Sequence, residues 1–530
     1  MKHKNTKKLI KGAVILSLAT LLAKVLSALY KIPLQNWTGD RGFYVYQQVY
    51  PLYGITAALA LNGFPLFVSS CIAEVDSEKG QIAVFKRLFY ILLLPFSFLG
   101  LLLYMYSQPL ANLMGDPQLS PLIQSIAFIY PLTAVIGSVR GFFQGQMNMM
   151  PTAVSQVAEQ LVRVSLILLI AFQFTQSDQS VYQMGQLAYL GTFAAAVVSS
   201  LILLLYGFSY RKKQKKLEMT GVTDQLPSKK NLYQRFLYEG LLLSAFSSLF
   251  ILLQLIDSFT VLNQLEKSGL SLAQSMIQKG VYDRGQPIAQ LGLVVSSGLT
   301  ATMLPSLSQP RLQKRPDRLK LEARSIIRLV VVFSGAASVG LIAIMPQLNR
   351  FLFASEDQTH VLAVYMLAVF LMSILLAFQN ILHIQKKQRV ILTGLTFILG
   401  IKLILNQLLI PLFQTMGASI ATVISLTVVV AYFTYHLKDI LLQTNQAPFI
   451  KGYSISLLAL GLFVRTLLTV LQALWGVGRG VTLAAILLAV AGGAAVFLRM
   501  IMVLQVLTIR EWVMLPMSER LLRGKKNGKN

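Results

Sequence analysis

Hydrophobic residues come in blocks of about 20 along this chain, separated by short polar segments. A helix of that length crosses the roughly 30 Å hydrocarbon layer of a bilayer, and the blocks lack the strict alternation that is typical of barrel strands. The pattern predicts an all-α polytopic membrane protein with fourteen transmembrane helices. Their expected spans are residues 9–33, 44–73, 88–106, 121–143, 151–174, 182–208, 236–262, 281–304, 325–346, 360–383, 390–411, 416–436, 452–474 and 481–506.

Composition agrees with this class, because only 13% of the 530 residues are charged, where soluble domains have about 25%. The net charge of +27 does not indicate nucleic-acid binding, since the basic residues lie in short loops and form no single stripe. The N-terminal segment resembles a signal peptide, but its apolar run continues past Lys24 to Tyr30 without a small-residue cleavage site, so we expect a retained first span. One cysteine allows no internal disulfide, and the four histidines lack metal-ligand spacing.

The loops divide the basic residues unevenly. With both termini placed in the cytoplasm, the inner segments hold 33 Lys or Arg residues. The outer segments hold five, namely Arg41, Lys267, Lys279, Arg350 and Arg479. This bias obeys the positive-inside rule and predicts a multi-pass protein of the plasma membrane with cytoplasmic N- and C-termini.

A basic segment at residues 209–235 divides the chain and predicts a linker at the anionic inner leaflet. Weak internal similarity relates its two sides, with Gln146 and Arg163 opposite Gln385 and Lys402 at a common offset of 239. An even number of spans in each repeat gives both repeats the same orientation. We therefore expect two six-helix lobes around a central cavity and an appended helix pair. The first lobe is expected at residues 1–208 and the second at 236–437. The two extra helices are expected at 438–506 and a basic cytoplasmic tail at 507–530.

More basic than acidic residues remain inside the predicted spans. The acids are Glu159, Asp257 and Asp283, with Glu239 near a span end. A charge at mid-bilayer costs about 2.5–3.5 kcal/mol, so these side chains should face protein or a watery cavity. The positive excess predicts an anionic substrate. The nine basic residues are Lys24, Lys31, Arg140, Arg163, Arg284, Arg328, Lys402, Arg465 and Arg499.

Two lysines of the first span stand out. Lys24 and Lys31 are two helical turns apart, so both project from one face, where two like charges need an anion or water between them. The alternative is that their stems snorkel to a membrane interface, more readily for Lys31, which is nearer the outer end. Snorkelling is also the expectation for Arg140, Arg328 and Arg499.

The span at 151–174 carries a polar stripe. Thr152, Gln156, Glu159 and Arg163 recur at helical spacing along one face. Glu159 and Arg163 are four residues apart and can pair. The stripe either faces the cavity and contacts substrate or holds a structural ion pair that fixes this helix against its neighbours.

The second lobe carries similar polar faces. Asp257 lies on one of them, and Lys402 shares another with Asn406. Asp283 and Arg284 begin a predicted span, where they either belong to a cavity-facing stripe or form a local pair at the helix start.

No catalytic constellation is present. The chain has no nucleophile with a histidine at plausible spacing, no Walker loop and no carboxylate pair in a soluble pocket. It is therefore predicted not to be an enzyme and to need no cofactor. Any pumping has to draw on a gradient or on the electrochemistry of the substrate.

Three stretches carry a resemblance to a known family. They are RGFFQGQMNMMPTAVSQVAEQLVRV from residue 140, QKGVYDRGQPIAQLG from 278 and KLILNQLLIPLFQTMGASIATVIS from 402. The chain resembles the multidrug/oligosaccharidyl-lipid/polysaccharide flippase superfamily, in its branch of MurJ-like lipid II flippases and stage V sporulation protein B-like proteins. The resemblance covers nearly the whole chain. It implies fourteen helices, alternating access, and transfer of an undecaprenyl-pyrophosphate-linked saccharide to the outer leaflet, with spans 13 and 14 forming a groove for the lipid tail.

The resemblance also implies site residues. The family's essential basic positions in span 1 match Lys24 and Lys31, where lysine offers pyrophosphate a point charge without the fork of arginine. Some relatives bind sodium in the second lobe, but here the ammonium of Lys402 can occupy the ion's place against Asp257. The positions matching that ion-coupling set are Asp257, Lys402, Asn406 and Thr422.

Lipid II, a peptidoglycan precursor, is the expected cargo, and the bilayer and cell-wall synthesis proteins are the expected partners. Membrane potential, at about 2.3 kcal/mol per charge per 100 mV, is the expected driving force. One alternative is another lipid-linked precursor, of capsule, exopolysaccharide or teichoic acid. Others are a cation-coupled multidrug exporter, which should hold more acids than bases, and a non-transporting scaffold. The candidate substrate contacts are Lys24, Lys31, Gln156, Glu159, Arg163, Asp283 and Arg284.

Overall fold

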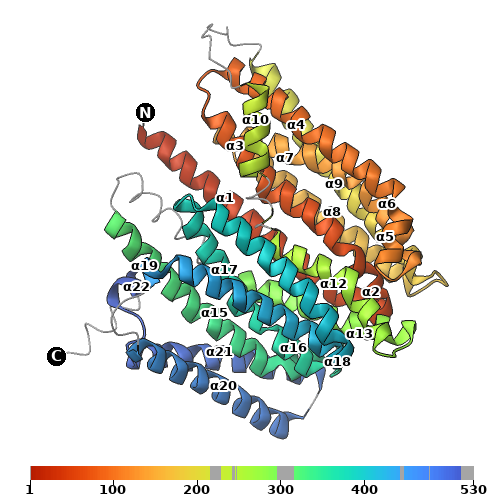
Figure 1. The fold of residues 1–530 in the computed structure, drawn as a ribbon, viewed down its shortest axis with the longest axis vertical. Coiled ribbons are helices and arrows are strands. Elements are labelled where there is room, and N and C mark those ends of the chain that lie inside the picture. Colours follow the sequence, from red (N-terminus) through yellow and green to blue (C-terminus); the bar gives the residue numbers. More distant parts are fainter. Residues whose placement is uncertain are drawn as a thin grey trace. The chain divides into compact units, whose positions relative to one another are not determined.

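The computed structural model describes residues 2–214, 228–240, 245, 248–294, 316–441, 447–476 and 478–514. Within these ranges the chain forms helices joined by turns, without a strand (Figure 1). The predicted all-α class is therefore confirmed for the described part of the chain.

The chain divides into two compact units, Met1–Asp283 and Arg284–Asn530. The predicted linker at 209–235 falls inside the first unit, where α9 continues to Gln214 and residues 215–227 lie outside the described ranges. The helices of the first unit are α1 (Lys2–Leu29), α2 (Lys31–Ala58), η1 (Leu59–Gly63), α3 (Phe64–Ala73), α4 (Glu78–Met105), α5 (Ser107–Leu113), η2 (Pro117–Leu119), α6 (Ser120–Ala127), α7 (Ile129–Gly145), α8 (Met150–Phe174), α9 (Val181–Gln214), α10 (Lys229–Arg235), η3 (Phe236–Gly240), α12 (Leu249–Lys267) and α13 (Leu272–Asp283).

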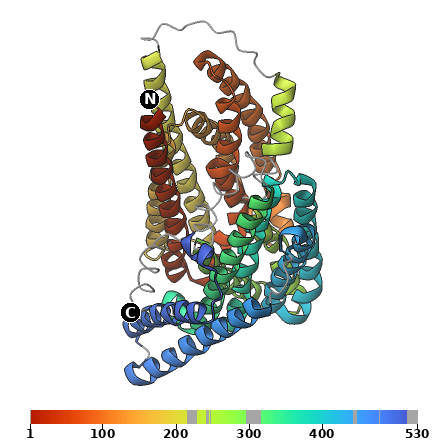
Figure 2. The same ribbon diagram turned by 90° about the vertical axis from the view of Figure 1, so that its left-hand side faces the viewer.

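The second unit begins with a helical segment at 285–294. Its two C-terminal long helices, α20 and α21, pack side by side (Figures 1 and 2). The named helices of this unit are α15 (Pro316–Phe353), α16 (Thr359–Tyr365), α17 (Leu367–Ile384), α18 (Gln388–His436), α19 (Lys438–Leu441), α20 (Ala447–Trp475), α21 (Arg479–Val503) and α22 (Ile509–Val513).

Eleven helical stretches in the described residues are long and apolar enough to cross a membrane. Val14–Ala73 covers the second predicted span and all but the first five residues of the first, and Gln388–His436 contains the eleventh and twelfth. The eighth predicted span, 281–304, lies partly outside the described residues. The count of fourteen stays a prediction.

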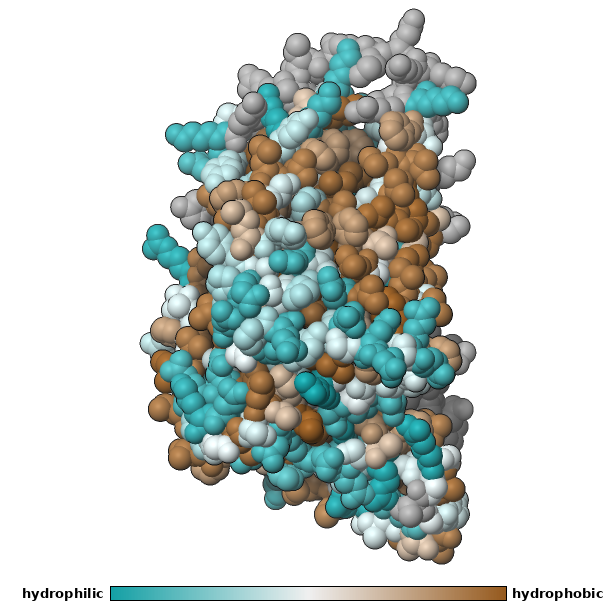
Figure 3. All heavy atoms as spheres, turned by 90° about the vertical axis from the view of Figure 1, so that its right-hand side faces the viewer, coloured by the Kyte–Doolittle hydropathy of each residue, from teal (hydrophilic) through white to brown (hydrophobic). Residues whose placement is uncertain are grey.

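Large apolar side chains cover much of the outer surface. On α4, Leu94 and Phe98 are 65% and 61% exposed. Figure 3 shows one face on which hydrophobic side chains gather into a broad area. Because a soluble protein rarely exposes large apolar patches, this surface suits contact with lipid.

Two helix breaks separate consecutive spans. In α2, Gly39 has φ 67° and ψ −179°, a conformation that glycine adopts without steric cost. Tyr30, between α1 and α2, is still right-handed helical, so the first span runs on to Thr38 and passes its predicted end at residue 33. In α18, Gln414 has φ 50°, which places the second break in the predicted gap between residues 411 and 416.

At two places the observed helices include charged residues that the sequence analysis assigned to loops. α4 begins at Glu78, ten residues before the predicted start, and the Ser77 side chain caps it by accepting from the Gly80 backbone N–H at 3.0 Å. Lys279 was predicted in an outer loop, but it is buried in α13. In both places charged residues within a helix had the pattern of a loop.

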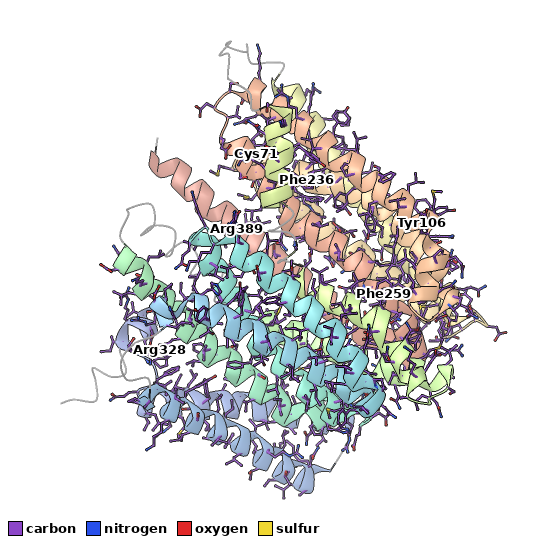
Figure 4. The ribbon with its side chains drawn as sticks, in the orientation of Figure 1. Cys71, Tyr106, Phe236, Phe259, Arg328 and Arg389 are labelled. Atoms are coloured by element: carbon purple, nitrogen blue, oxygen red, sulfur yellow. The ribbon has the colours of Figure 1, made fainter. Side chains whose placement is uncertain are left out.

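Close packing of α3 on α7 depends on a stripe of small residues. Gly137, Gly141 and Gly145 recur every fourth position on α7, and a Cβ added at each would lie 2.5–2.7 Å from a side chain of α3. Such stripes let helix backbones approach closely inside a membrane. The same α3 carries Cys71, and Phe236 of η3 lies 5.7 Å from the Phe67 ring (Figure 4).

The C-terminal helix α22 is tied to α15 by charged side chains. Arg328, labelled in Figure 4, lies 3.5 Å from Glu511 and donates to the Val506 carbonyl at 2.9 Å. Arg510 pairs with Glu322 at 2.8 Å. Arg328 thus has partners within the unit, and the snorkelling expected of it stays a prediction. Of the predicted basic tail at 507–530, residues 515–530 lie outside the described ranges.

Replacing Gly141 with leucine should separate α3 from α7, since the new side chain would meet Val68 at 2.5 Å. Overpacking of this kind costs about 1–3 kcal/mol. We expect a lower thermal unfolding midpoint for the purified Gly141→Leu protein. The matched control is Gly400→Leu, where an added Cβ meets nothing within 4 Å. Equal midpoints for the two variants would contradict the packing role.

Candidate functional site

The predicted polar stripe on α8 is buried inside the first unit. Thr152, Gln156, Glu159 and Arg163 are each at most 8% exposed. Gln156 accepts from the Thr20 hydroxyl of α1 at 3.4 Å, which fixes the stripe against the first span. The four residues therefore share one inward face of α8, as their spacing predicts.

Glu159 pairs with Arg140 of α7 and not with Arg163. The Arg140 to Glu159 distance is 2.8 Å, and Arg140 also donates to Ser155 and Ser199 at 3.0 Å each. The predicted Glu159–Arg163 pair is wrong, and so is the snorkelling expected of Arg140, which is fully buried. Packing of α7 and α9 around α8 supplies these partners from distant parts of the sequence.

Arg163 is held by neutral groups. Its guanidinium donates to the Tyr53 hydroxyl and, at 2.6 Å, to the Gln160 side chain. It also lies over two aromatic rings, 5.5 Å from the centre of Tyr30 and 5.1 Å from that of Tyr53. No ion pair with a carboxylate accompanies it in the described part of this unit. The guanidinium group is therefore held in place, but its charge is not neutralised.

Lys31 is the second cation of this region. It is 0% exposed, its Nζ has no hydrogen-bond partner in the described chain, and it lies 3.7 Å from the centre of the Tyr50 ring. The charges of Arg163 and Asp283 both act on it, the first repelling and the second attracting. Snorkelling is therefore wrong for Lys31. Lys24, two turns earlier, is exposed, so the two lysines meet different surroundings.

A group of tyrosines surrounds these cations and was missed in the sequence analysis. The hydroxyls of Tyr30 and Tyr46 are 2.8 Å apart, and Tyr46 stacks on Tyr189 at 5.0 Å. Tyr50 and Tyr53 complete the group. Tyr46, Tyr50 and Tyr53 are spaced by four and three residues, a helical spacing that signals a shared face. Their rings present negative faces to cations.

Two candidate acids, Asp283 and Asp257, have partners within the first unit. Asp283 forms an ion pair with Lys279 at 2.7 Å, both within α13 and both buried. Asp257 accepts from the Tyr282 hydroxyl at 3.1 Å. The i, i+4 lysine on the same helix thus pairs with the Asp283 carboxylate, and the expected local pair of Asp283 with Arg284 stays a prediction.

The second unit holds the remaining candidates. Arg284 donates to Asn349 at 3.4 Å and lies 5.3 Å from the ring centre of Phe353. On α18, Lys402 donates to the Ala418 carbonyl at 3.1 Å and to the Thr422 hydroxyl at 2.5 Å. Two residues of the predicted ion-coupling set are thus in contact. The expected approach of Lys402 to Asp257 stays a prediction.

Asn406 lies one turn beyond Lys402 on α18 and is fully buried. No group of three or more His, Cys, Asp or Glu side chains that could hold a metal occurs in the described residues. The polar interior of α18 is therefore built on an ammonium group and neutral oxygens.

Outside the spans, one carboxyl ties helix ends of the first unit together. Asp116 Oδ2 accepts from the hydroxyls of Tyr182 at 2.8 Å and Tyr44 at 3.3 Å, and Oδ1 accepts from the Gln118 backbone N–H at 3.1 Å. Burial raises the pKa of the Asp116 carboxyl, and these donors oppose the rise. The carboxyl therefore links Tyr44 of α2 to Tyr182 of α9.

Comparison with known proteins identifies a family. The profile of the family described as "Polysaccharide biosynthesis protein" matches residues 9–310. The uncharacterized membrane protein YabM of Bacillus subtilis (strain 168) is 32% identical over 517 residues, covering 96% of this chain and 95% of the relative. Lipid II flippase MurJ of the same organism is 26% identical over 442 residues, covering 78% and 80%.

A solved structure shares the fold. It is lipid II flippase MurJ in an inward closed conformation, with a TM-score of 0.63 and 14% identity, and the match covers 92% of this chain and 98% of that one. At this identity the likeness concerns the fold alone.

Removing the Glu159 carboxylate should leave Arg140 buried without its counter-charge. Loss of one partner of a buried ion pair costs about 3–5 kcal/mol, so we expect Glu159→Gln to lower the thermal unfolding midpoint strongly. The double variant Arg140→Met/Glu159→Gln should recover much of the loss, since no charge then stays unpaired. Losses that simply add would contradict the pairing.

Proposed function

Since the chain belongs to the polysaccharide biosynthesis protein family, in the MurJ-like branch of the flippase superfamily that its sequence resembles, we propose that it flips an undecaprenyl-pyrophosphate-linked saccharide. Lipid II is the first candidate, moved from the inner to the outer leaflet of the plasma membrane. The chain acts as a transporter and makes or breaks no covalent bond.

One observation carries this proposal, the buried ammonium of Lys31. It has an aromatic ring beneath it and no hydrogen-bond acceptor in the described chain, and Arg163 adds a second positive charge nearby. A buried cation without a counter-ion costs several kcal/mol. A pyrophosphate between the two cations supplies both the missing charge and the missing acceptors.

The roles of the other candidates follow from their partners. Glu159 neutralises Arg140, so it leaves the charge of Arg163 available to an anion. Lys24 is exposed and gives an arriving pyrophosphate its first contact. Because Lys31 is closed off in this state, transport requires α1 and the start of α2 to open, with the break at Gly39 as a hinge point.

Membrane potential is the proposed driving force. Each negative charge that moves outward through an inside-negative potential yields about 2.3 kcal/mol per 100 mV. In the second unit, the hydrogen bonds of Lys402 to Ala418 and Thr422 support an ammonium in place of a bound sodium ion. Export then needs no coupled cation.

Another lipid-linked saccharide is the second candidate. The family description names polysaccharide biosynthesis without a particular polymer, and every undecaprenyl-pyrophosphate carrier presents the same anion to Lys31 and Arg163. Precursors of capsule, exopolysaccharide or teichoic acid therefore fit the same cations. With either cargo, we propose that the protein contacts the proteins that use the exported precursor.

Replacing Lys31 with methionine should abolish flipping, because the stem is kept and the charge is lost. Lys31→Arg should retain activity, since it restores a cation. The measurement is rescue of growth or wall synthesis in depleted cells, with membrane insertion checked by immunoblot. Lys24→Ala should also lose function while inserting normally. Full activity of a well-inserted Lys31→Met protein would contradict the proposed anion site.

The cargo is identified by depleting the protein in cells that lack related flippases. The lipid-linked intermediate that accumulates in the inner leaflet is then extracted and analysed by mass spectrometry. We expect lipid II. A different prenyl-linked glycan would replace lipid II as the cargo, and accumulation of no such lipid would contradict the proposed flipping.

A further inference from the structure

A groove with a volume of about 450 Å³ opens on the surface of the first unit. It lies between the first third of α4 and the last turns of α7 and α9, and these helices pack side by side (Figure 1). Its volume is within the range of about 300–1,000 Å³ seen for small-molecule sites. None of the residues of the proposed substrate site lines it.

The walls of this groove are almost entirely apolar. Phe85 and Phe142 pack at 4.9 Å between ring centres, and Leu204 and Phe208 at its open side are 44% and 63% exposed. Gly207 also lines it, and an added Cβ there meets nothing within 4 Å. In a membrane-spanning chain such a surface faces hydrocarbon, so an acyl chain is its natural occupant.

One end of the groove is polar and positively charged. Lys86 lines it and is exposed. Tyr210 lines the same end, where its ring lies 5.6 Å from Phe142 and its hydroxyl accepts from Gln146 at 2.7 Å. The nearby helix ends add the exposed cations Lys79 and Lys212 and the exposed acids Asp76 and Glu78. The charged residue that lines the groove itself is Lys86, and its ammonium group matches a phosphate at the end of an acyl chain.

We infer that this groove binds one anionic phospholipid of the bilayer, with an acyl chain between α4, α7 and α9 and its phosphate against Lys86. Juxtamembrane basic residues attract anionic lipid head groups by about 1 kcal/mol each. The apolar walls retain the chain, and the charge selects the head group. The site is separate from the proposed flipping path and stands without it.

Native mass spectrometry of the full-length protein in detergent tests this directly. Phosphatidylglycerol and phosphatidylcholine with identical acyl chains are titrated in parallel. We expect the wild-type protein to bind phosphatidylglycerol about fivefold more tightly. Lys86→Ala should bring the two affinities together while keeping chain binding.

Filling the groove gives the sharper variant. Gly207→Phe should remove most of the binding of both lipids, because its ring occupies open space in the groove. Gly400→Phe is the matched control, since Gly400 is also a helical glycine with nothing within 4 Å of an added Cβ, and it lies outside the groove. Unchanged lipid binding by a folded Gly207→Phe protein would overturn the inference.

A photoreactive phosphatidylglycerol provides a measurement that needs no variant. A diazirine on its acyl chain should label peptides of α4, α7 and α9 in the wild-type protein in vesicles. Labelling spread evenly over the exposed helices would overturn a specific site. Binding of a prenyl pyrophosphate that phosphatidylglycerol fails to displace would also overturn it, because the groove would then serve the cargo.

Discussion

The interior of the first unit depends on how the charge of Lys31 is accommodated. A desolvated cation over an aromatic ring gains about 2 kcal/mol, which is less than the several kcal/mol that an unpaired buried ion costs. Tyr50 beneath Lys31 therefore offsets only part of that cost, and the repulsion from Arg163 adds to it while the attraction from Asp283 opposes it. The surrounding tyrosines hold both cations in place without neutralising them, which supports the proposal that an anion binds here.

The helix α8 separates a structural charge from an available one within about one turn. Glu159 satisfies Arg140 and locks α7, α8 and α9 together. Arg163, four residues on, is oriented by Tyr53 and Gln160, both neutral. In the second unit Lys402 is also satisfied by neutral oxygens. The positive excess of the sequence thus includes cations that form ion pairs, such as Arg140, and cations that neutral groups hold, such as Arg163.

Periodicity predicted the parts of this arrangement that lie within one helix. The inward stripe of α8 follows from helical spacing. The break within α18 follows from the gap between two apolar blocks, where Gln414 lies. Periodicity did not predict the partner of Glu159, because Arg140 is 19 residues away and contacts it only through the packing of two helices. Lys31 packs on Tyr50, which lies beyond the break at Gly39, and no spacing along the first span encodes this contact.

The central claim is that Lys31 and Arg163 form a binding site for pyrophosphate. Its most direct test is binding of undecaprenyl pyrophosphate and of uncharged undecaprenol to the purified protein, compared between wild type and Lys31→Met. The account predicts that the wild-type protein prefers the pyrophosphate and that Lys31→Met loses this preference while binding undecaprenol equally well. An unchanged preference in Lys31→Met would contradict it.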